Sequence, residues 1–150
     1  MRGQTAPVTI REIREEDIAS GFIEVLKGLT QVGDLTGEKA LNILNAIRKN
    51  PLHKIYVAVS GSGRILGATT LLVEPKFIHG GRSVAHIEDV VVAKTSRTTG
   101  IGRALIEHAL ENAKKFGCYK CILDCDRNVV GFYKKLGFSE HGIEMRVDFR

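Results

Sequence analysis

The most informative part of the chain is the stretch Val90-Val91-Val92-Ala93-Lys94-Thr95-Ser96-Arg97-Thr98-Thr99-Gly100-Ile101-Gly102-Arg103-Ala104-Leu105. A run of β-branched residues leads into a basic, hydroxyl-rich loop, two glycines follow, and a helix begins. The first turn of a helix has backbone N–H groups without an intrahelical partner, and glycines let a ligand approach the backbone closely. The stretch therefore predicts a strand, loop and helix that bind an anion such as phosphate.

The local sequence fits neither of the common nucleotide-binding motifs. The dinucleotide fingerprint needs a third glycine, which residues 97–102 lack. A P-loop needs Gly-Lys-Ser/Thr, whereas the chain has Gly102-Arg103-Ala104. A structural alternative stays open, in which the glycines only ease the packing of the strand against the helix.

Apolar periodicity and turn residues predict alternating strands and helices along the rest of the chain. We expect strands over residues 8–13, 54–60, 65–73, 84–92, 119–124 and 143–149. We expect helices over residues 16–29, from Thr36 to Asn50, over 101–115 and over 129–136. The strands at 84–92 and 119–124 should be parallel, because a helix crosses over between them. No linker divides the sequence, so we expect a single α/β domain over residues 1–150.

Composition and charge limit the class of protein. The chain has 150 residues, of which 43% are hydrophobic and 26% charged, as in ordinary globular domains. It has no apolar run that could span a bilayer and no signal-peptide core, so we expect a cytoplasmic protein without a membrane partner, with organelle targeting left open. The net charge of +5 is spread among acids along the chain, which disfavours a nucleic-acid partner.

The three cysteines, Cys118, Cys121 and Cys125, lie close together in the sequence. Cys118 and Cys121 have the C-x-x-C spacing of a redox pair, but they lie in a predicted strand, and redox pairs begin helices. A second C-x-x-C that could complete a zinc site is absent from the sequence. We therefore expect buried structural thiols and no metal.

Further segments carry groups that could take part in chemistry. In His86-Ile87-Glu88-Asp89, strand alternation puts His86 and Glu88 on one face and Asp89 on the other. Asp124 closes the next strand, at the end where parallel sheets bind ligands. Tyr133, on a short helix beside the same opening, could donate a proton. The alternative for the acids is a salt-bridged strand end.

These motifs, in this order, resemble those of the GNAT acetyltransferase superfamily. Its Arg/Gln-x-x-Gly-x-Gly/Ala motif matches at Arg97, Gly100 and Gly102, and its Phe-Tyr-x-x-x-Gly-Phe motif matches at residues 132–138. Segments 26–33, 86–90, 117–120, 122–126 and 144–145 are similar to the glucosamine-6-phosphate N-acetyltransferase family. The resemblance covers roughly residues 10–147 and implies the GNAT fold, a mixed central sheet with helices on both faces.

The resemblance also implies a reaction and a set of site residues. The reaction is transfer of the acetyl group of acetyl-CoA to the 2-amine of glucosamine 6-phosphate, in the biosynthesis of UDP-N-acetylglucosamine, by a homodimer. The acetyl-CoA site would comprise Val90, Val91, Val92, Arg97, Thr98, Thr99, Gly100, Ile101, Gly102, Arg103, Asn128 and Tyr133. The sugar phosphate would contact Thr30, Lys76, His79, Glu88, Asp89 and Asp124.

Three positions depart from the family pattern. Thr98 stands where the family often has a glycine, which would stiffen the loop. Asn128 lies one residue earlier than the asparagine that contacts CoA in the family. Asp148 occupies the place of a C-terminal arginine that helps to hold the sugar phosphate, which leaves Arg146 or Arg150 to replace it.

The expected mechanism is direct attack in a ternary complex. A sugar amine should lose its proton more easily than lysine does, so little general-base power is needed. Asp124 or Glu88 would accept that proton, the Val90 N–H would hydrogen-bond the intermediate, and Tyr133 would protonate the leaving thiolate. The alternative function is acetylation of another amine, such as a peptide N-terminus, a lysine or a polyamine. A binding protein without turnover is disfavoured, because Glu88, Asp124 and Tyr133 occur together.

Overall fold

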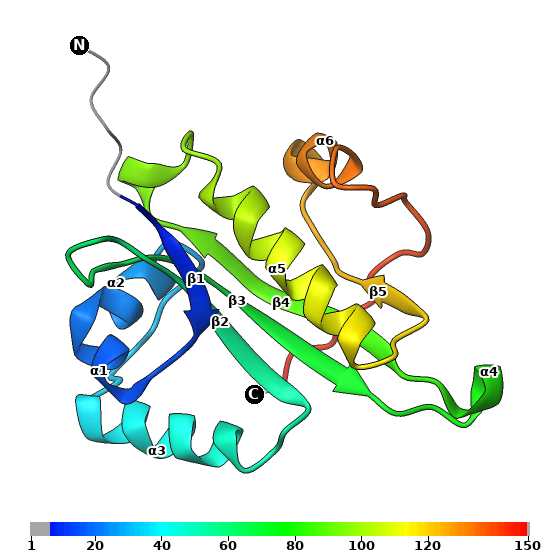
Figure 1. The fold of residues 1–150 in the computed structure, drawn as a ribbon, viewed down its shortest axis with the longest axis horizontal. Coiled ribbons are helices and arrows are strands. Elements are labelled where there is room, and N and C mark those ends of the chain that lie inside the picture. The colour runs from blue at the N-terminus through cyan, green and yellow to red at the C-terminus, as the bar shows by residue number, and fades with distance from the viewer. Residues whose placement is uncertain (1–6, 150) are drawn as a thin grey trace.

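The computed structural model describes residues 7–149 and contains one five-stranded sheet (Figure 1). The strands lie in chain order: β1 (Thr9–Glu12), β2 (His53–Val59), β3 (Ile65–Glu74), β4 (Val84–Val92) and β5 (Lys120–Ile122). Neighbours from β1 to β4 are antiparallel, whereas β4 and β5 are parallel. The mixed sheet and the predicted parallel pair are therefore confirmed.

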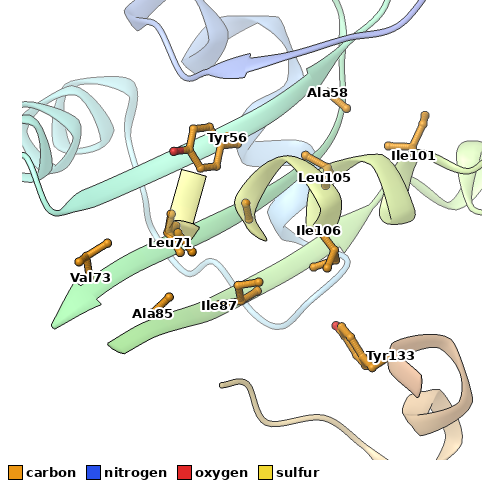
Figure 2. Packing of buried hydrophobic residues seen from close by; sticks show 12 residues of the cluster. Tyr56, Ala58, Leu71, Val73, Ala85, Ile87, Ile101, Leu105, Ile106 and Tyr133 are labelled. Carbon is orange, nitrogen blue, oxygen red and sulfur yellow. The ribbon is translucent and has the colours of Figure 1, made fainter. Parts of the chain in front are cut away.

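Helices cover both faces of the sheet (Figure 1). On one face α5 (Ile101–Lys115) buries Leu105, Ile106 and Ala109 against β2, β3 and β4, in the cluster drawn in Figure 2. The other face packs against α1 (Glu15–Asp17), α2 (Ile23–Leu26) and α3 (Gly37–Arg48), where Thr36 caps α3 by accepting from the Lys39 N–H. The remaining elements are short turns of helix: η1 (Ile18–Phe22), α4 (Ile78–Gly81), η2 (Lys94–Ser96), η3 (Arg127–Val129) and α6 (Val130–Lys134).

The first predicted helix, over residues 16–29, is broken in the structure. Its backbone leaves the helical region at Ser20 and at Gly21, which has φ 106°, so α1 and α2 are separated by one wide turn. Glycine adopts this left-handed conformation without the steric cost that a Cβ would add. The break lets Phe22 and Val25 both reach the core, although they belong to different helical segments.

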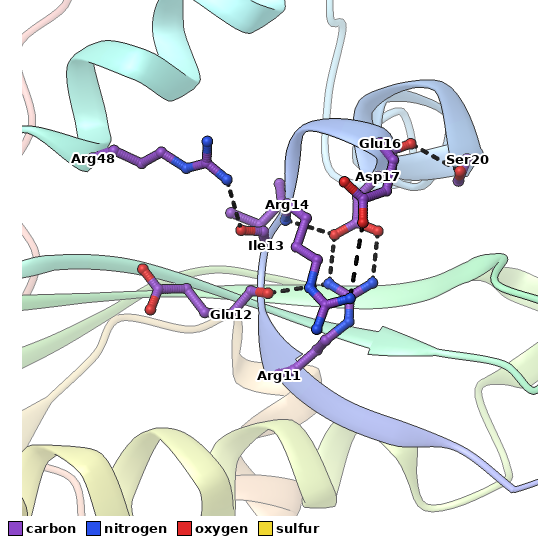
Figure 3. A network of polar contacts seen from close by, with 8 residues as sticks. All are labelled: Arg11, Glu12, Ile13, Arg14, Glu16, Asp17, Ser20 and Arg48. Carbon is purple, nitrogen blue, oxygen red and sulfur yellow. Dashed lines mark hydrogen bonds and ion pairs between the residues drawn. The ribbon is translucent and has the colours of Figure 1, made fainter.

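An ion pair fixes the junction between β1 and α1 (Figure 3). The Asp17 carboxylate is buried and accepts two hydrogen bonds from the Arg11 guanidinium, at 2.7 and 2.9 Å, and one from the Arg14 N–H at 2.7 Å. Arg48 of α3 donates to the Ile13 carbonyl at 3.4 Å. Burial opposes ionisation of Asp17, but the Arg11 hydrogen bonds and the Arg14 N–H hold its pKa below the usual value.

The predicted strand over residues 143–149 is wrong for this chain. Residues 139–149 form neither helix nor strand, and the chain returns from α6 past β5 in extended form (Figure 1). The alternating apolar residues of this segment are exposed: Ile143, Met145, Val147 and Phe149. Alternation of apolar residues indicates only that one side of an extended segment is apolar. A strand also needs a neighbouring strand with which its backbone can form hydrogen bonds.

Within residues 7–149, no helix combines the length and the apolar character that crossing a bilayer requires.

Candidate active site

The site begins where β4 and β5 separate. The two strands pair at Val84–Lys120, Ala85–Cys121 and His86–Ile122, and the pairing ends there. The predicted strand over 119–124 is thus only three residues long, and Asp124 lies two residues beyond it. If the register is continued, Asp124 stands level with Glu88 across the opening. The carboxylates that the sequence placed at separate strand positions are brought to one opening.

A bulge in β4 places a second carboxylate beside Glu88. Ala68 of β3 pairs with Val91, and Thr70 pairs with Glu88, so two residues of β4 oppose one residue of β3. Asp89, the first of these two, has φ 50°. As a result Glu88 and Asp89 both line the same groove, which contradicts the prediction that Asp89 faces the other side. Strand alternation holds only while the pairing is regular.

The groove beside these acids lies between the sheet and the α1–α3 face. It has a volume of about 400 Å³, and its wall is largely apolar. Helices α2 and α3 contribute Ile23, Leu26, Leu44 and Ile47, and the sheet contributes Ile55, Thr70 and Leu72. Glu88 and Asp89 are polar groups at its edge, so a ligand there would meet two carboxylates against an apolar wall.

Electrostatics distinguish Glu88 from its neighbours. Burial of its carboxyl raises the pKa of Glu88, and the negative charges of Asp89, Asp124 and Glu144 raise it further, while His86 opposes them. Glu88 is thereby moved toward the range in which a carboxylate accepts protons well at neutral pH. The sequence marked Glu144 only as part of a family-like segment and gave it no site role, because its approach to Glu88 depends on the path of the C-terminal segment.

His86 belongs to a separate network of polar contacts around Glu74. Its Nε2 lies 2.8 Å from Glu74 Oε2, and Lys76 Nζ lies 2.6 Å from Glu74 Oε1. His86 is therefore hydrogen-bonded to Glu74 at this end of the strand. Lys76 is held at the same end of the sheet by the same carboxylate.

Beyond the bulge, β4 leads into the predicted anion loop. Arg97 Nε donates to the Val92 carbonyl at 3.4 Å, and the Thr99 hydroxyl donates to the Ser96 carbonyl at 2.6 Å. Gly100 has φ 82° and directly precedes α5, whose N-terminus has no side-chain cap. The helix N–H groups and the positive end of the helix dipole thus face the loop, as an anion site requires.

The other predicted loop residues surround this helix start. Thr98 is exposed, Ile101 is buried in the core, and the Arg103 guanidinium lies 2.7 Å from Glu107 on the surface of α5. A Cβ on Gly102 would meet Phe132 at 3.4 Å, so α6 lies against the first turn of α5. The segments that carry the two predicted motifs are therefore in contact.

Tyr133 extends from α6 toward α5 and β4, and its ring is part of the core cluster (Figure 2). Burial raises the pKa of Tyr133, and the charge of a Cys125 thiolate would raise it further. The phenol therefore stays protonated at neutral pH and can donate a proton. Asn128 lies in η3, two residues before α6, and is exposed.

The remaining predicted sugar-phosphate residues lie in two places. Thr30 follows α2 and is exposed. It lies two residues after Gly28, whose backbone passes close to β4, because a Cβ on Gly28 would lie 3.3 Å from Val91. His79 lies instead at the far end of the sheet, in α4, and its ring stacks on Tyr119 at 4.2 Å. From Val84 to Glu88 alone the strand rises about 13 Å. His79 is therefore not brought to Glu88 within one chain, whereas Lys76 is held beside Glu74 and His86.

The cysteines are free thiols, as expected, but only partly buried. Cys118 and Cys121 pack against the α5 core, and burial raises the pKa of Cys121 to about 12. Cys125 is exposed, so the expectation of burial is wrong there, because β5 ends before it. Residues 7–149 contain no group of three or more His, Cys, Asp or Glu side chains arranged to hold a metal ion.

Comparison with known proteins agrees with this geometry. The sequence profile of the acetyltransferase (GNAT) family matches residues 21–138. A glucosamine 6-phosphate N-acetyltransferase from Trypanosoma brucei brucei is 40% identical over 139 residues, which are 93% of this chain and 94% of that protein. The crystal structure of glucosamine-6-phosphate N-acetyltransferase from Arabidopsis thaliana superimposes with a TM-score of 0.93 at 34% identity, over 96% of this chain and 99% of that one.

A third relative, the glucosamine 6-phosphate N-acetyltransferase of Candida albicans, is 36% identical over 91% of this chain and 93% of its own length. These matches span nearly the whole chain, and the family profile covers the site segments from Thr30 to Tyr133. The chain therefore belongs to the GNAT acetyltransferase family, and within that family to the glucosamine 6-phosphate N-acetyltransferases.

Proposed function

We propose that this protein transfers the acetyl group of acetyl-CoA to the 2-amine of glucosamine 6-phosphate and releases N-acetylglucosamine 6-phosphate and CoA. The observation that carries the proposal is the bulge in β4, which presents Glu88 and Asp89 together opposite Asp124. The strand that carries Glu88 and Asp89 continues through the loop into α5, whose N-terminus has no side-chain cap and suits the CoA pyrophosphate. The choice of glucosamine 6-phosphate as the acceptor rests on the names of the relatives.

Acetyl-CoA would bind along the free edge of β4 and the loop that follows it. The edge beyond His86 has no strand partner within the described residues, so the backbone of Val90, Val91 and Val92 can hydrogen-bond the pantetheine arm. The pyrophosphate would accept from N–H groups of the loop from Arg97 to Arg103. Tyr133 and Asn128 would approach the same cosubstrate from the α6 side.

The acceptor would bind at the opening, with its amine toward the acids and Thr30 toward its phosphate. Asp124 or Glu88 takes the proton of the amine, directly or through a water molecule, as the nitrogen attacks the thioester carbonyl. The Val90 N–H donates to the carbonyl oxygen, which gains negative charge. The carbon–sulfur bond then breaks, and Tyr133 protonates the departing thiolate. No covalent enzyme intermediate forms.

We also propose that the protein acts as a homodimer. His79, stacked on Tyr119 at the far end of the sheet, lies too far from Glu88 to bind the same sugar in one chain, so a second copy would supply it. The exposed apolar side chains of residues 143–149 alternate along an extended segment, which suits pairing with another chain. Exposed apolar surface of this kind is typical of an interface.

A thiol-release assay tests the proposed acceptor. We expect CoA to be released with glucosamine 6-phosphate and much less with glucosamine, with polyamines or with peptides. Asp124→Asn should lower kcat/KM for glucosamine 6-phosphate by about a hundredfold, the low end of general-base effects. The matched control is Asp126→Asn, two residues further along the same exposed loop. If another amine is acetylated faster, glucosamine 6-phosphate is not the acceptor. If Asp124→Asn keeps full activity, the acceptor does not bind at Asp124.

A further inference from the structure

Thr69 is the residue of β3 that faces the bulge. Its neighbours Ala68 and Thr70 pair with Val91 and Glu88, so Thr69 alone stands opposite Asp89 and Val90. Its side chain is fully buried, on the opposite face from the groove that Thr70 lines. It is one of the few buried polar residues in the described part of the chain.

The conformation of Asp89 needs support from its surroundings. With φ 50°, Asp89 is one of the non-glycine residues in the left-handed region, together with His79. Residues with a Cβ pay a steric cost there, and such a conformation persists only where the surrounding structure holds it. Because the register shifts at this point, the regular ladder of the two strands does not provide that support.

The Thr69 hydroxyl supplies a contact at the bulge. Its Oγ1 donates to the carbonyl oxygen of Glu88 at 3.3 Å. That carbonyl belongs to the peptide group that joins Glu88 to Asp89, so the bond fixes the orientation of this group. Because Thr69 is fully buried, loss of this contact would leave its hydroxyl without a partner, which is costly. The contact therefore opposes return of the backbone to a regular pairing.

We propose that Thr69 is a positioning residue, whose hydroxyl locks the bulge and thereby aims Glu88, Asp89 and the Val90 N–H at the reacting groups. This role rests on the proposed function, because these three residues are placed in the reaction there. Thr69 itself touches neither substrate. What matters is the hydroxyl, since the β-branched shape alone would be supplied equally by valine.

Three substitutions separate the hydroxyl from the shape. Thr69→Val keeps the shape and removes the hydrogen bond, Thr69→Ser keeps the hydroxyl and removes a methyl group, and Thr69→Ala removes both. We expect kcat to fall about tenfold in Thr69→Val and Thr69→Ala and to stay within about twofold in Thr69→Ser. KM for acetyl-CoA should change less than twofold, because the phosphate loop is not affected.

A second measurement does not depend on turnover. In ¹H–¹⁵N spectra, the amides of Glu88, Asp89 and Val90 should shift in Thr69→Val and keep their wild-type positions in Thr69→Ser. Wild-type kinetics and unshifted amides in Thr69→Val would overturn the proposal, as would an equal loss of activity in Thr69→Ser. If Thr69→Val fails to fold, the comparison of Thr69→Ser with Thr69→Ala decides the question.

The two measurements also keep this proposal distinct from the proposed reaction. If the wild-type protein does not acetylate glucosamine 6-phosphate, the reaction is wrong, while the amide shifts still test the role of Thr69. If the wild type is active and Thr69→Val matches it, only the role of Thr69 is wrong.

Discussion

Tyr133 is the residue whose chemical role is most directly testable. Its pKa is raised by burial, so removal of the hydroxyl removes a proton donor and leaves the ring in the core. We expect Tyr133→Phe to lower kcat by about a hundredfold, with KM for glucosamine 6-phosphate nearly unchanged. Steady-state kinetics check this, with Tyr56→Phe as the control, because Tyr56 is a buried phenol that packs on His108 and is not part of the proposed site. Unchanged kcat in Tyr133→Phe would remove the residue from the mechanism.

Glu144 provides a test of Glu88 as the base. Its negative charge is one of the causes that raise the pKa of Glu88, together with burial, Asp89 and Asp124. A base must be deprotonated to act, so kcat/KM should rise with pH through the pKa of Glu88. Glu144→Gln removes a charge that raises this pKa, and the acidic limb of the profile should therefore move to lower pH.

The control for this shift is Glu140→Gln, which removes an equal charge from the same segment, where Glu140 pairs with Lys134 instead. It should leave the acidic limb in place. If Glu144→Gln also leaves it in place, the group that titrates is not Glu88.

At the scale of single residues, the sequence predicts which side chains can take part in the reaction better than it predicts the face of the sheet on which each one lies. Glu88, Asp124 and Tyr133 were recognised by type and spacing, and the structure brings the first two to one opening and Tyr133 to the neighbouring core. The face of Asp89 could not be predicted, because it depends on the register shift between β3 and β4, which follows from strand pairing and not from the local sequence. The approach of Glu144 to Glu88 could not be predicted for a similar reason, since its position depends on tertiary structure.

The element that binds the anion can be tested through its glycines. Gly100 has φ 82°, and an L-residue in this conformation costs about 1–2 kcal/mol. A Cβ there would meet nothing within 4 Å, so the cost is in the backbone, and the exposed loop should relax away from the binding conformation. We expect Gly100→Ala to raise KM for acetyl-CoA about fivefold to thirtyfold at unchanged kcat.

Gly102→Ala is the matched control for Gly100→Ala. Its Cβ would lie 3.4 Å from Phe132 and 3.5 Å from Val92, which is ordinary contact, and the position is helical. Its KM for acetyl-CoA should stay within about twofold of wild type. If both variants behave alike, the conformation of Gly100 is not what the loop requires.

The junction of β1 and α1 depends on the buried Asp17. Asp17→Asn leaves the Arg11 guanidinium without its carboxylate, and we expect a loss of about 2–3 kcal/mol in the free energy of unfolding at pH 7. The pKa of Asp17 is lowered in the folded state, so this stabilisation is complete above its unfolded pKa of about 4. It is lost as the pH falls through the lower folded value.

Urea denaturation at pH 7 and pH 3 measures this difference, which should shrink at pH 3. Glu16→Gln is the control, because Glu16 is exposed and lies 3.8 Å from Arg14. It should change stability by less than about 0.5 kcal/mol at either pH. An equal loss in both variants would mean that burial of Asp17 is not decisive.

At the scale of elements, the sequence predicts the order and type of most elements, but it misses interruptions and predicts a strand over residues 143–149 that does not form. The strand, loop and helix from Val90 onward and the helix capped by Thr36 follow from local signals. The break at Gly21 did not, because one glycine inside a long apolar period is also tolerated in an unbroken helix. The length of β5 could not be predicted either, because it depends on where β4 and β5 separate, and the local sequence does not determine that point.

At the scale of the whole molecule, the apolar residues of the C-terminal segment predict association. Met145 and Val147 are 89% and 72% exposed in the single chain. If they form the interface, Met145→Asp combined with Val147→Asp should give a particle of 16.5 kDa, where the wild type has twice that mass. Sedimentation equilibrium measures this, with Leu41→Asp on α3 as an exposed apolar control. A wild-type monomer with full activity would contradict the proposed dimer.

Sharing of the active site between chains makes a stronger prediction than mass alone. His79 lies far from Asp124 in one chain, so a site would combine Asp124 of one copy with His79 of the other. His79→Ala and Asp124→Asn should each be nearly inactive. In a dimer of one His79→Ala chain and one Asp124→Asn chain, one site carries both substitutions. The other site has the unchanged Asp124 and His79 and is intact. Random co-assembly should then restore about a quarter of wild-type activity, since about half of the dimers are mixed and half of their sites are intact. Activity measured on co-expressed, differently tagged chains checks this. If the mixed dimers are as inactive as the separate variants, each site is built within one chain, and the position of His79 must change on substrate binding.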